Sequence, residues 1–321
     1  MRIEVIEGSP EWHALRLDYV GGSEISGLWG LQEAYGASAF TLHMVKARKI
    51  PAPPVDDSPG SRVWAGKRKE ATIATMGAEL YGWTIEKGGY YTNDSVPGAG
   101  ASLDYIITEP GKHEASRGFS GPGALQIKNV DQIQYFQKWI DGEPPFSILL
   151  QHQHELDCAG LSWGVILAEV GGNQFPAFWY DVNERIRDAN REKIADFWAG
   201  VRAGKAPPVD GTDSTAEALR EVYPWKPDEE IMSMISDNEM PLLVTQLLTA
   251  RAAAKQNEAD IQDAQNQIKA KLGGARRAEG IGWTVRVQVN KDTPDRLAQP
   301  GEIIKGRRGA VILKATQDIR Q

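Results

Sequence analysis

Two short stretches of the sequence decide the fold: Gly100-Ala101-Ser102-Leu103-Asp104-Tyr105 and Gly123-Ala124-Leu125-Gln126-Ile127-Lys128-Asn129. Both are short runs with apolar flanks, of the kind that forms adjacent strands of a sheet. Because side chains alternate along a strand, Gln126 and Lys128 are expected to face the same side. The two stretches therefore predict that the carboxylate of Asp104 lies beside Gln126 and Lys128 on a neighbouring strand.

A carboxylate next to an acid-x-Lys triplet is typical of metal-dependent cleavage of phosphodiester bonds. Hard carboxylate oxygens hold Mg²⁺, and the lysine supports the attacking water. In such a site the first residue of the triplet is expected to be acidic, and here it is Gln126. The pattern thus predicts a phosphodiesterase site that lacks one expected carboxylate.

Four further stretches accompany this pair along the chain. They read Trp12-His13-Ala14-Leu15-Arg16 with Gly21-Gly22-Ser23-Glu24-Ile25, Gly66-Lys67-Arg68-Lys69-Glu70, Gln151-His152-Gln153, and Phe197-Trp198-Ala199-Gly200-Val201 before Pro207-Pro208. In this order the six stretches resemble those of the lambda exonuclease and YqaJ-type viral recombinase family, within the PD-(D/E)xK nuclease superfamily. The resemblance extends over residues 8–208.

The resemblance implies an α/β fold of the restriction-endonuclease-like class, with a mixed central sheet flanked by helices. It also implies Mg²⁺-dependent hydrolysis of DNA, with Mn²⁺ as an alternative cation. The enzyme would resect double-stranded DNA ends in the 5′ to 3′ direction and leave a 3′ single strand for a single-strand annealing protein. The expected setting is phage-type recombination in the cytoplasm of a bacterial host. Family members include ring-shaped trimers, so a homo-oligomer stays an open alternative.

The metal ligands that the resemblance implies are Asp104, residue 126, the carbonyl of Ile127 and, in an assisting role, Glu70. Glu70 falls near the apolar face of an expected helix, where a half-buried acid needs a charged partner. The residues alone leave other interpretations open. Asp104 could cap a turn, and Glu70 could be a surface acid paired with the lysine at 67 or 69.

Lys128 and Gln151 complete the implied catalytic set. The ammonium of Lys128 would neutralise charge that develops on the phosphate, or lower the pKa of the attacking water. Gln151, on a following helix, would hydrogen-bond the water or the phosphate. His152 and His154 on the same helix do not suggest zinc, because a spacing of two places them on different helix faces.

Gln126 has two competing explanations. Its amide oxygen can bind a hard cation, but the amide removes one negative charge from a site that needs charge to hold Mg²⁺. Either the substitution disables catalysis while preserving shape, as in a protein made to trap its substrate, or Glu70 and Asp104 suffice in a natural variant. We favour a disabled site. The rival functions are a non-catalytic DNA-binding recombination module and an endonuclease or nickase of the same fold.

Arg16 and Ser23 resemble the family positions that hold the terminal 5′-phosphate of DNA. The guanidinium of Arg16 matches phosphate oxygens, and Gly21-Gly22-Ser23 at the start of an expected helix presents N–H groups to an anion. Ser23 could instead be an ordinary helix N-cap. An end-binding pocket argues against an endonuclease, because cutting at internal positions does not need one.

Bulk composition predicts a soluble intracellular protein. The chain has 321 residues, enough for one or two domains, and its one cysteine, Cys158, excludes an intramolecular disulfide. The stretch Met1–Glu7 carries acids where a signal peptide would carry an apolar core. A membrane-spanning helix needs about 18 or more consecutive apolar residues, and no segment of the sequence comes close to that length.

Alternating helical and extended patterns predict an α/β exonuclease domain at residues 1–208. Helices are expected at 11–19, 22–29, 66–82, 131–140 and 146–160, and strands at 83–92, 101–108, 122–129, 163–170 and 175–182, with a hairpin tip at 111–121. A long amphipathic helix that carries Ile186 and Val201 closes the domain. The segment 209–240 is rich in Pro, Asp and Glu, which predicts a linker.

Residues 241–321 are predicted to form a basic extension, a long helix followed by a β-hairpin. Apolar residues or Ala recur every three or four positions between Leu242 and Leu272, and Gly273-Gly274 ends the helix. The stretch Trp283–Val289 alternates as a half-buried strand does, and a last strand near 310–314 is expected to pair with it.

The charge of the chain is unevenly distributed. The net charge is −7, but Lys269 to Gln321 contains twelve Lys or Arg and five Asp or Glu, a local charge of +7. Residues 1–268 therefore carry −14. Such asymmetry indicates contact with a polyanion, and the alternative is a solvated basic surface.

Overall fold

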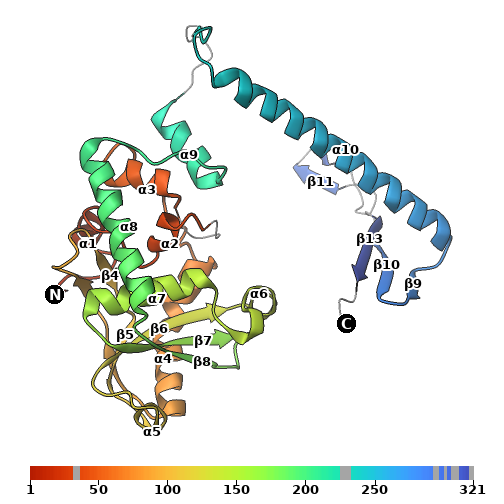
Figure 1. Cartoon of the computed structure of the whole chain (residues 1–321). Helices are drawn as coiled ribbons and strands as arrows, with labels where there is room; N and C mark the ends of the chain where they lie inside the picture. Colours follow the sequence, from red (N-terminus) through yellow and green to blue (C-terminus); the bar gives the residue numbers. More distant parts are fainter. Residues whose placement is uncertain (32–36, 225–232, 292–295, 300–301, 305–310, 318–321) are drawn as a thin grey trace. The chain divides into compact units, whose positions relative to one another are not determined.

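The chain divides into two compact units, Met1–Pro227 and Asp228–Gln321 (Figure 1). The computed structural model describes residues 1–31, 37–224, 233–291, 296–299, 302–304 and 311–317. The first unit contains all the residues that the sequence assigns to the site.

The core of the first unit is a five-stranded mixed sheet with the strand order β2-β5-β6-β7-β8. Its strands are β2 (Thr84–Lys87), β5 (Tyr105–Glu109), β6 (Gly123–Val130), β7 (Trp163–Val170) and β8 (Ala177–Asp181). Strands β6 and β7 run parallel, whereas the other neighbours are antiparallel. Every residue of β7 is buried, as expected of a central strand covered on both faces.

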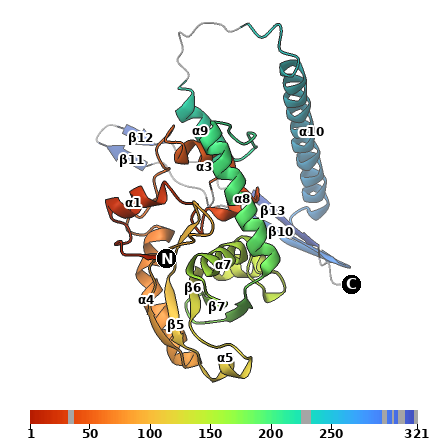
Figure 2. The ribbon, with the colours of Figure 1, turned by 60° about the vertical axis from the view of Figure 1, so that its left-hand side comes forward.

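Helices cover both faces of this sheet (Figure 2). On one face, Ile73 and Ala74 of α4 (Arg62–Tyr81) pack on Leu125 and Ile127 of β6. On the other face, α7 (Phe146–Ala159) and α8 (Glu184–Ala203) pack over Ala124. The predicted fold class, a mixed sheet flanked by helices, is confirmed.

Two segments that the sequence predicts as single strands are each broken. Residues 83–92 contribute β2 to the central sheet and β3 (Tyr90–Thr92) to a second sheet, and residues 101–108 contribute β4 (Gly100–Ser102) and β5 in the same way. The second sheet has the order β1-β3-β4, where β1 spans Arg2–Ile3. Both breaks occur at the same level, because the Gly88 N–H donates to the Asp104 carbonyl at 3.0 Å. Asp104 therefore lies at the junction of the two sheets and not inside a strand.

Gly88 permits this junction. A Cβ atom at position 88 would lie 2.0 Å from the carbonyl oxygen of Leu103. Only glycine lets the two backbones come so close.

Some helices differ from the sequence-based expectation. The helices expected at 11–19 and 22–29 are shorter, α1 (Pro10–Arg16) and α2 (Ile25–Leu28), and α3 (Ala39–Lys46) and α5 (Lys112–Ser116) were not expected. Between β6 and α7 lie α6 (Gln132–Lys138) and the short helix η1 (Ile140–Gly142).

A further unexpected helix, α9 (Asp213–Val222), occupies part of the segment expected to be a linker. Its Ala218 and Leu219 pack against Phe40 and Val45 of α3. The acidic and proline-rich composition conceals this narrow apolar face. The first compact unit consequently extends past the expected end at Pro208.

The second unit contains the predicted long helix, α10 (Met240–Leu272), and the predicted β-hairpin extension. A sheet of order β13-β10-β9 follows, formed by β9 (Arg277–Gly280), β10 (Trp283–Val289) and β13 (Val311–Gln317), and a separate pair is formed by β11 (Arg296–Gln299) and β12 (Glu302–Ile304). The strand expected near 310–314 is β13, which pairs antiparallel with β10, while Ala310 lies outside the described residues. Among the described helices, none has the length and apolarity needed to cross a membrane.

We predict that Gly88→Ala destabilises the first unit by about 1–3 kcal/mol, because its methyl group would overlap the Leu103 carbonyl. Urea unfolding followed by circular dichroism measures this change. Gly66→Ala on α4 is the matched control: a Cβ atom at position 66 would meet nothing within 4 Å, so this helical substitution should leave stability unchanged or raise it. Equal stabilities of the Gly88→Ala and Gly66→Ala proteins would contradict the junction argument.

Candidate active site

The junction before β5 brings Asp104 beside the middle of β6. In the antiparallel ladder Tyr105 pairs with Leu125, so the preceding residue, Asp104, comes level with Gln126. The N–H of Ile127 donates a hydrogen bond of 2.7 Å to Oδ2 of Asp104. The acid and the triplet that the sequence singled out are thus neighbours.

Alternation along β6 directs Gln126 and Lys128 toward α7. Leu125 packs on the α4 side of the sheet, whereas Ala124 packs on the α7 side. Nζ of Lys128 donates a hydrogen bond of 3.1 Å to Oε1 of Gln151 on α7. The two residues therefore share a face, and Gln151 lies on it as well.

Glu155, one helical turn after Gln151, also faces the site, although it is not among the residues predicted from the sequence. Nε2 of Gln151 donates a hydrogen bond of 2.7 Å to Oε1 of Glu155. The Glu155 residue is 3% exposed. A position four residues after a site residue on a helix lies on the same face, and that spacing was the available signal.

Gln126 is buried without partners. It is 1% exposed, and neither Oε1 nor Nε2 has a hydrogen-bond partner among the described residues. An unsatisfied buried polar atom costs about 1–3 kcal/mol, so such atoms usually meet a ligand, an ion or a water. An amide oxygen is a known type of ligand for hard cations, which makes Gln126 chemically suited to a Mg²⁺ site.

Asp104 and Glu155 have raised pKa values. Burial and, next, the charge of Glu70 raise the pKa of Asp104 to about 6, against the opposing effect of Lys128. Burial and the charge of Asp104 raise the pKa of Glu155 to about 8, again against Lys128. Crowded, desolvated carboxylates bind protons readily, and a divalent cation relieves the same repulsion.

Glu70 lies close enough to Asp104 to raise its pKa, but it is paired. Nζ of Lys87 forms the ion pair with Glu70, and the same ammonium lies 4.8 Å above the ring of Tyr105. The alternative partners on the helix bind elsewhere: Lys69 forms an ion pair with Glu169, and Lys67 lies 4.0 Å from Asp57. A cation at Asp104 would compete with Lys87 for Glu70.

The oxygen atoms of the candidate site fit a divalent cation, and most of the residues that offer them are uncharged donors. Within the described part of the chain, no three His, Cys, Asp or Glu side chains lie close enough together to share one metal ion. Asp104 comes level with Gln126 and binds the Ile127 N–H, so its carboxylate, the amide of Gln126 and the carbonyl of Ile127 offer hard oxygen donors on adjoining backbone. Such a set can hold Mg²⁺ or Mn²⁺ if one more carboxylate reaches it.

A cleft of about 780 Å³ opens beside this site. Lys128 and Gln151 line it together with Ser23, Lys69 and Lys138. Ammonium groups along a cleft attract the phosphates of a nucleic acid. The cleft therefore presents ammonium groups to a nucleic acid strand next to Lys128 and Gln151.

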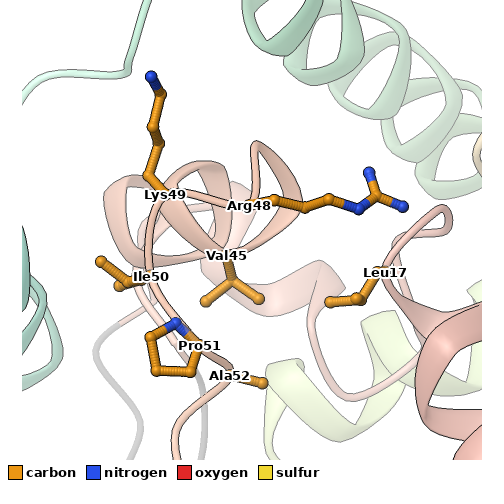
Figure 3. A pocket seen from close by; sticks show the side chains of 7 residues that line it. All are labelled: Leu17, Val45, Arg48, Lys49, Ile50, Pro51 and Ala52. Carbon is orange, nitrogen blue, oxygen red and sulfur yellow. The ribbon is translucent and has the colours of Figure 1, made fainter.

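A second hollow contains none of the predicted site residues (Figure 3). Its volume is about 380 Å³, and it is lined mainly by apolar side chains such as Leu17, Val45 and Ile50. Arg48 at its edge forms an ion pair of 2.8 Å with Asp18. The chemistry of the molecule is consequently assigned to the cleft beside Asp104.

Arg16 is bound to a carboxylate of the protein itself. Its guanidinium lies 3.5 Å from Oε1 of Glu24 and 4.6 Å from the ring of Trp12. Oε2 of the same carboxylate accepts hydrogen bonds from the buried Lys46 and from the Gly21 N–H, both at 2.7 Å. Glu24 thus holds the donors that the sequence assigned to a terminal phosphate.

Ser23 lines the cleft, but its helix is short. The helix begins later than expected, with Glu24 as its N-cap, and has four residues. Its dipole is correspondingly weak, so the N–H groups of the helix start contribute less to anion binding than the sequence suggested. Sequence reasoning missed the roles of Glu24 and Lys46, whose pairing is long-range.

The two histidines of α7 are structural. Nε2 of His154 lies 3.1 Å from the carbonyl oxygens of Val20 and Gly100. Burial lowers the pKa of His152 to about 3, which keeps it neutral. Neither ring is directed to a shared metal among the described residues.

Replacing Glu155 by Gln should change how stability depends on pH in the metal-free protein. A carboxyl whose pKa is higher in the folded chain binds more protons when folded, so its contribution to stability falls as pH rises between the two pKa values. For Glu155 this window runs from 4.5 to about 8. Within it, the free energy of unfolding should fall more steeply with pH for the unaltered protein than for Glu155→Gln, as measured by urea unfolding with a chelator.

Glu79→Gln is the control for this experiment, because Glu79 is exposed on α4. The free energy of unfolding of Glu79→Gln should depend on pH as that of the unaltered protein does. Parallel curves for Glu155→Gln and the unaltered protein would show that Glu155 titrates alike in the folded and unfolded chains.

The chain is similar to one known protein family and to solved nuclease structures. Residues 11–162 match the family described as the YqaJ-like viral recombinase domain. No curated protein matches the chain. An alkaline exonuclease from Laribacter hongkongensis has a similar solved structure, with 15% identity and a TM-score of 0.49, covering 61% of this chain and 94% of that one. A second structure of that exonuclease, in complex with dAMP, gives 16% identity and a TM-score of 0.48 over the same shares of the two chains. The matched segment 11–162, which contains Asp104, Gln126, Lys128 and Gln151, is similar to YqaJ-like viral recombinase domains.

Proposed function

We propose that the protein is a divalent-cation-dependent deoxyribonuclease. The observation that carries this proposal is the hydrogen bond from the Ile127 N–H to Asp104, which brings the acid to β6 between Gln126 and Lys128, beside a lysine-lined cleft. Hard oxygen donors next to an ammonium group suit phosphodiester hydrolysis, and the viral recombinase family makes DNA the expected substrate.

The residues that would hold the cation are Asp104, Gln126 through its amide oxygen, and Ile127 through its carbonyl, with Glu70 assisting. Bound there, Mg²⁺ or Mn²⁺ would polarise a phosphoryl oxygen and make the attacking water more acidic. The hydrogen bond from the Ile127 N–H keeps the Asp104 carboxylate turned toward β6. The protein thereby fixes its principal acid before any ligand arrives.

Lys128 stabilises negative charge on the phosphate. Its ammonium is positioned by Oε1 of Gln151, and the opposite end of that amide is held by Glu155. A donor fixed in this way needs little reorganisation as charge develops, which is the condition for effective electrostatic stabilisation. Gln151 therefore acts first as a positioning residue for Lys128.

The finer proposal is 5′ to 3′ resection of double-stranded DNA ends in phage-type recombination, beside a single-strand annealing protein. It is supported by the resemblance in motif order and by the viral recombinase family. The basic segment from Lys269 to Gln321 would add sequence-independent affinity for DNA through its phosphates.

A non-catalytic DNA-binding module is the second candidate, and Gln126 favours it. An amide in place of an acid lowers the negative charge available for a cation. We propose that the substitution impairs the site without abolishing its function, because the other oxygen donors remain in place.

Adding the missing charge should therefore accelerate the enzyme. We expect Gln126→Glu to degrade a 5′-phosphorylated linear duplex about 10-fold faster or more with Mg²⁺, and Asp104→Asn to lose the activity. Gln246→Glu, at an exposed position of α10, is the control and should leave the rate unchanged. Equal rates for Gln126→Glu and the unaltered protein would remove residue 126 from the metal site, and inactivity of both would favour the binding module.

Arg16 is expected to give the preference for a phosphorylated end. A terminal phosphate carries more charge than an internal diester, so it can compete with Glu24 for the guanidinium. In the Gln126→Glu protein, a 5′-phosphorylated duplex should be degraded faster than a 5′-hydroxyl duplex, and Arg16→Ala should erase the difference. Arg48→Ala, which breaks the exposed pair with Asp18, should preserve it. A preference that survives Arg16→Ala would place end recognition elsewhere and strengthen the endonuclease alternative.

A further inference from the structure

Glu155 is a buried acid that the proposed chemistry does not yet use. It lies on the face of α7 that covers β6, and the hydrogen bond that the structure describes for its carboxylate comes from the neutral amide of Gln151. Burial of a carboxylate is unfavourable unless a positive partner compensates it. Lys128 of the site is hydrogen-bonded to Gln151.

The surroundings of Glu155 point to the site on β6. Gln151 links the carboxylate of Glu155 to the ammonium of Lys128 through hydrogen bonds of 2.7 and 3.1 Å. The charge of Asp104 also raises the pKa of Glu155. Gln126 supplies a second, independent observation on the same face of β6. Gln126 is 1% exposed, and its amide has no hydrogen-bond partner among the described residues. Its oxygen is therefore available to bind a cation.

Gly22 packs closely against the carboxylate of Glu155. A Cβ atom at position 22 would lie 3.1 Å from Oε1 of Glu155 and 3.2 Å from Cγ of Gln151. Gly22 and Gln151 both line the cleft. The carboxylate of Glu155 therefore lies directly behind a residue that lines the cleft.

We propose that Glu155 is an acidic ligand of the divalent cation and replaces, from helix α7, the carboxylate that strand position 126 lacks. The proposal rests on the proposed function. Asp104 and Glu155 together supply two negative charges for a hard divalent cation, and Gln126 and Ile127 supply neutral oxygens. Relocating the acid explains why an amide is tolerated at position 126.

The alternative role for Glu155 is purely positional. In that case its carboxylate fixes the amide of Gln151, and through it Lys128, without touching the cation. The two roles differ in cation affinity measured without DNA. A positioning residue would leave that affinity unchanged, whereas a ligand would not.

Mn²⁺ binding to the full chain separates these roles. Affinity is measured by isothermal titration calorimetry and by electron paramagnetic resonance of free Mn²⁺, without DNA. Glu155→Gln should weaken binding about 10-fold or more, and Gln126→Glu should strengthen it. The double variant Gln126→Glu/Glu155→Gln should recover the affinity of the unaltered protein to within about 3-fold, because the acid has moved back to the strand. Glu79→Gln is the control and should bind as the unaltered protein does.

Each outcome decides between the proposal and its alternatives. If Glu155→Gln binds Mn²⁺ as tightly as the unaltered protein, Glu155 is not a ligand, while the proposed nuclease function stands. If neither the unaltered protein nor Gln126→Glu binds Mn²⁺, the proposed function fails and the inference fails with it. Should Glu155→Gln not fold by circular dichroism, Glu155→Asp keeps the charge but withdraws the carboxylate, and undiminished affinity there overturns the proposal.

Discussion

The hydrogen bond from the Ile127 N–H to Asp104 joins the edge of one sheet to the middle of another. Asp104 lies where two segments leave the small sheet and enter the central one, and Gly88 lets their backbones meet there. Because the acid lies at this junction, its carboxylate is free of the strand alternation that fixes its neighbours. The rest of the candidate site is arranged around the place where this carboxylate meets β6.

Burial controls the electrostatics of that place. The α7 helix seals the face of β6, which removes water from Gln126 and Glu155 and strengthens every charge interaction there. The Lys128 ammonium moderates the repulsion between Asp104 and Glu155, and Gln151 holds the ammonium in position. The same burial that makes these carboxylates costly to maintain strengthens their attraction for a positive charge.

Local rules predicted the part of the site that lies on one strand. Alternation on β6 was enough to place Gln126 and Lys128 on the same face, and apolar runs were enough to identify the central strands and α10. Contacts between distant segments could not be predicted in this way. The pairing of Glu24 with Arg16 and the packing of α9 on α3 both depend on tertiary structure that periodicity does not encode. Glu155 was missed because an isolated acid on a helix is usually a solvated one.

The position of the second acid follows from how a metal site uses the fold. A cation responds to where oxygen atoms converge and to their total charge, and it is indifferent to the element that carries them. Strand β6 and helix α7 face each other across the pocket, so a carboxylate from either can reach the same point. An amide at Gln126 keeps an oxygen donor on the strand, while Glu155 on the helix keeps the charge. The loss of an acid from a sequence motif is therefore weak evidence for loss of metal binding until the buried acids on the facing helix have been considered.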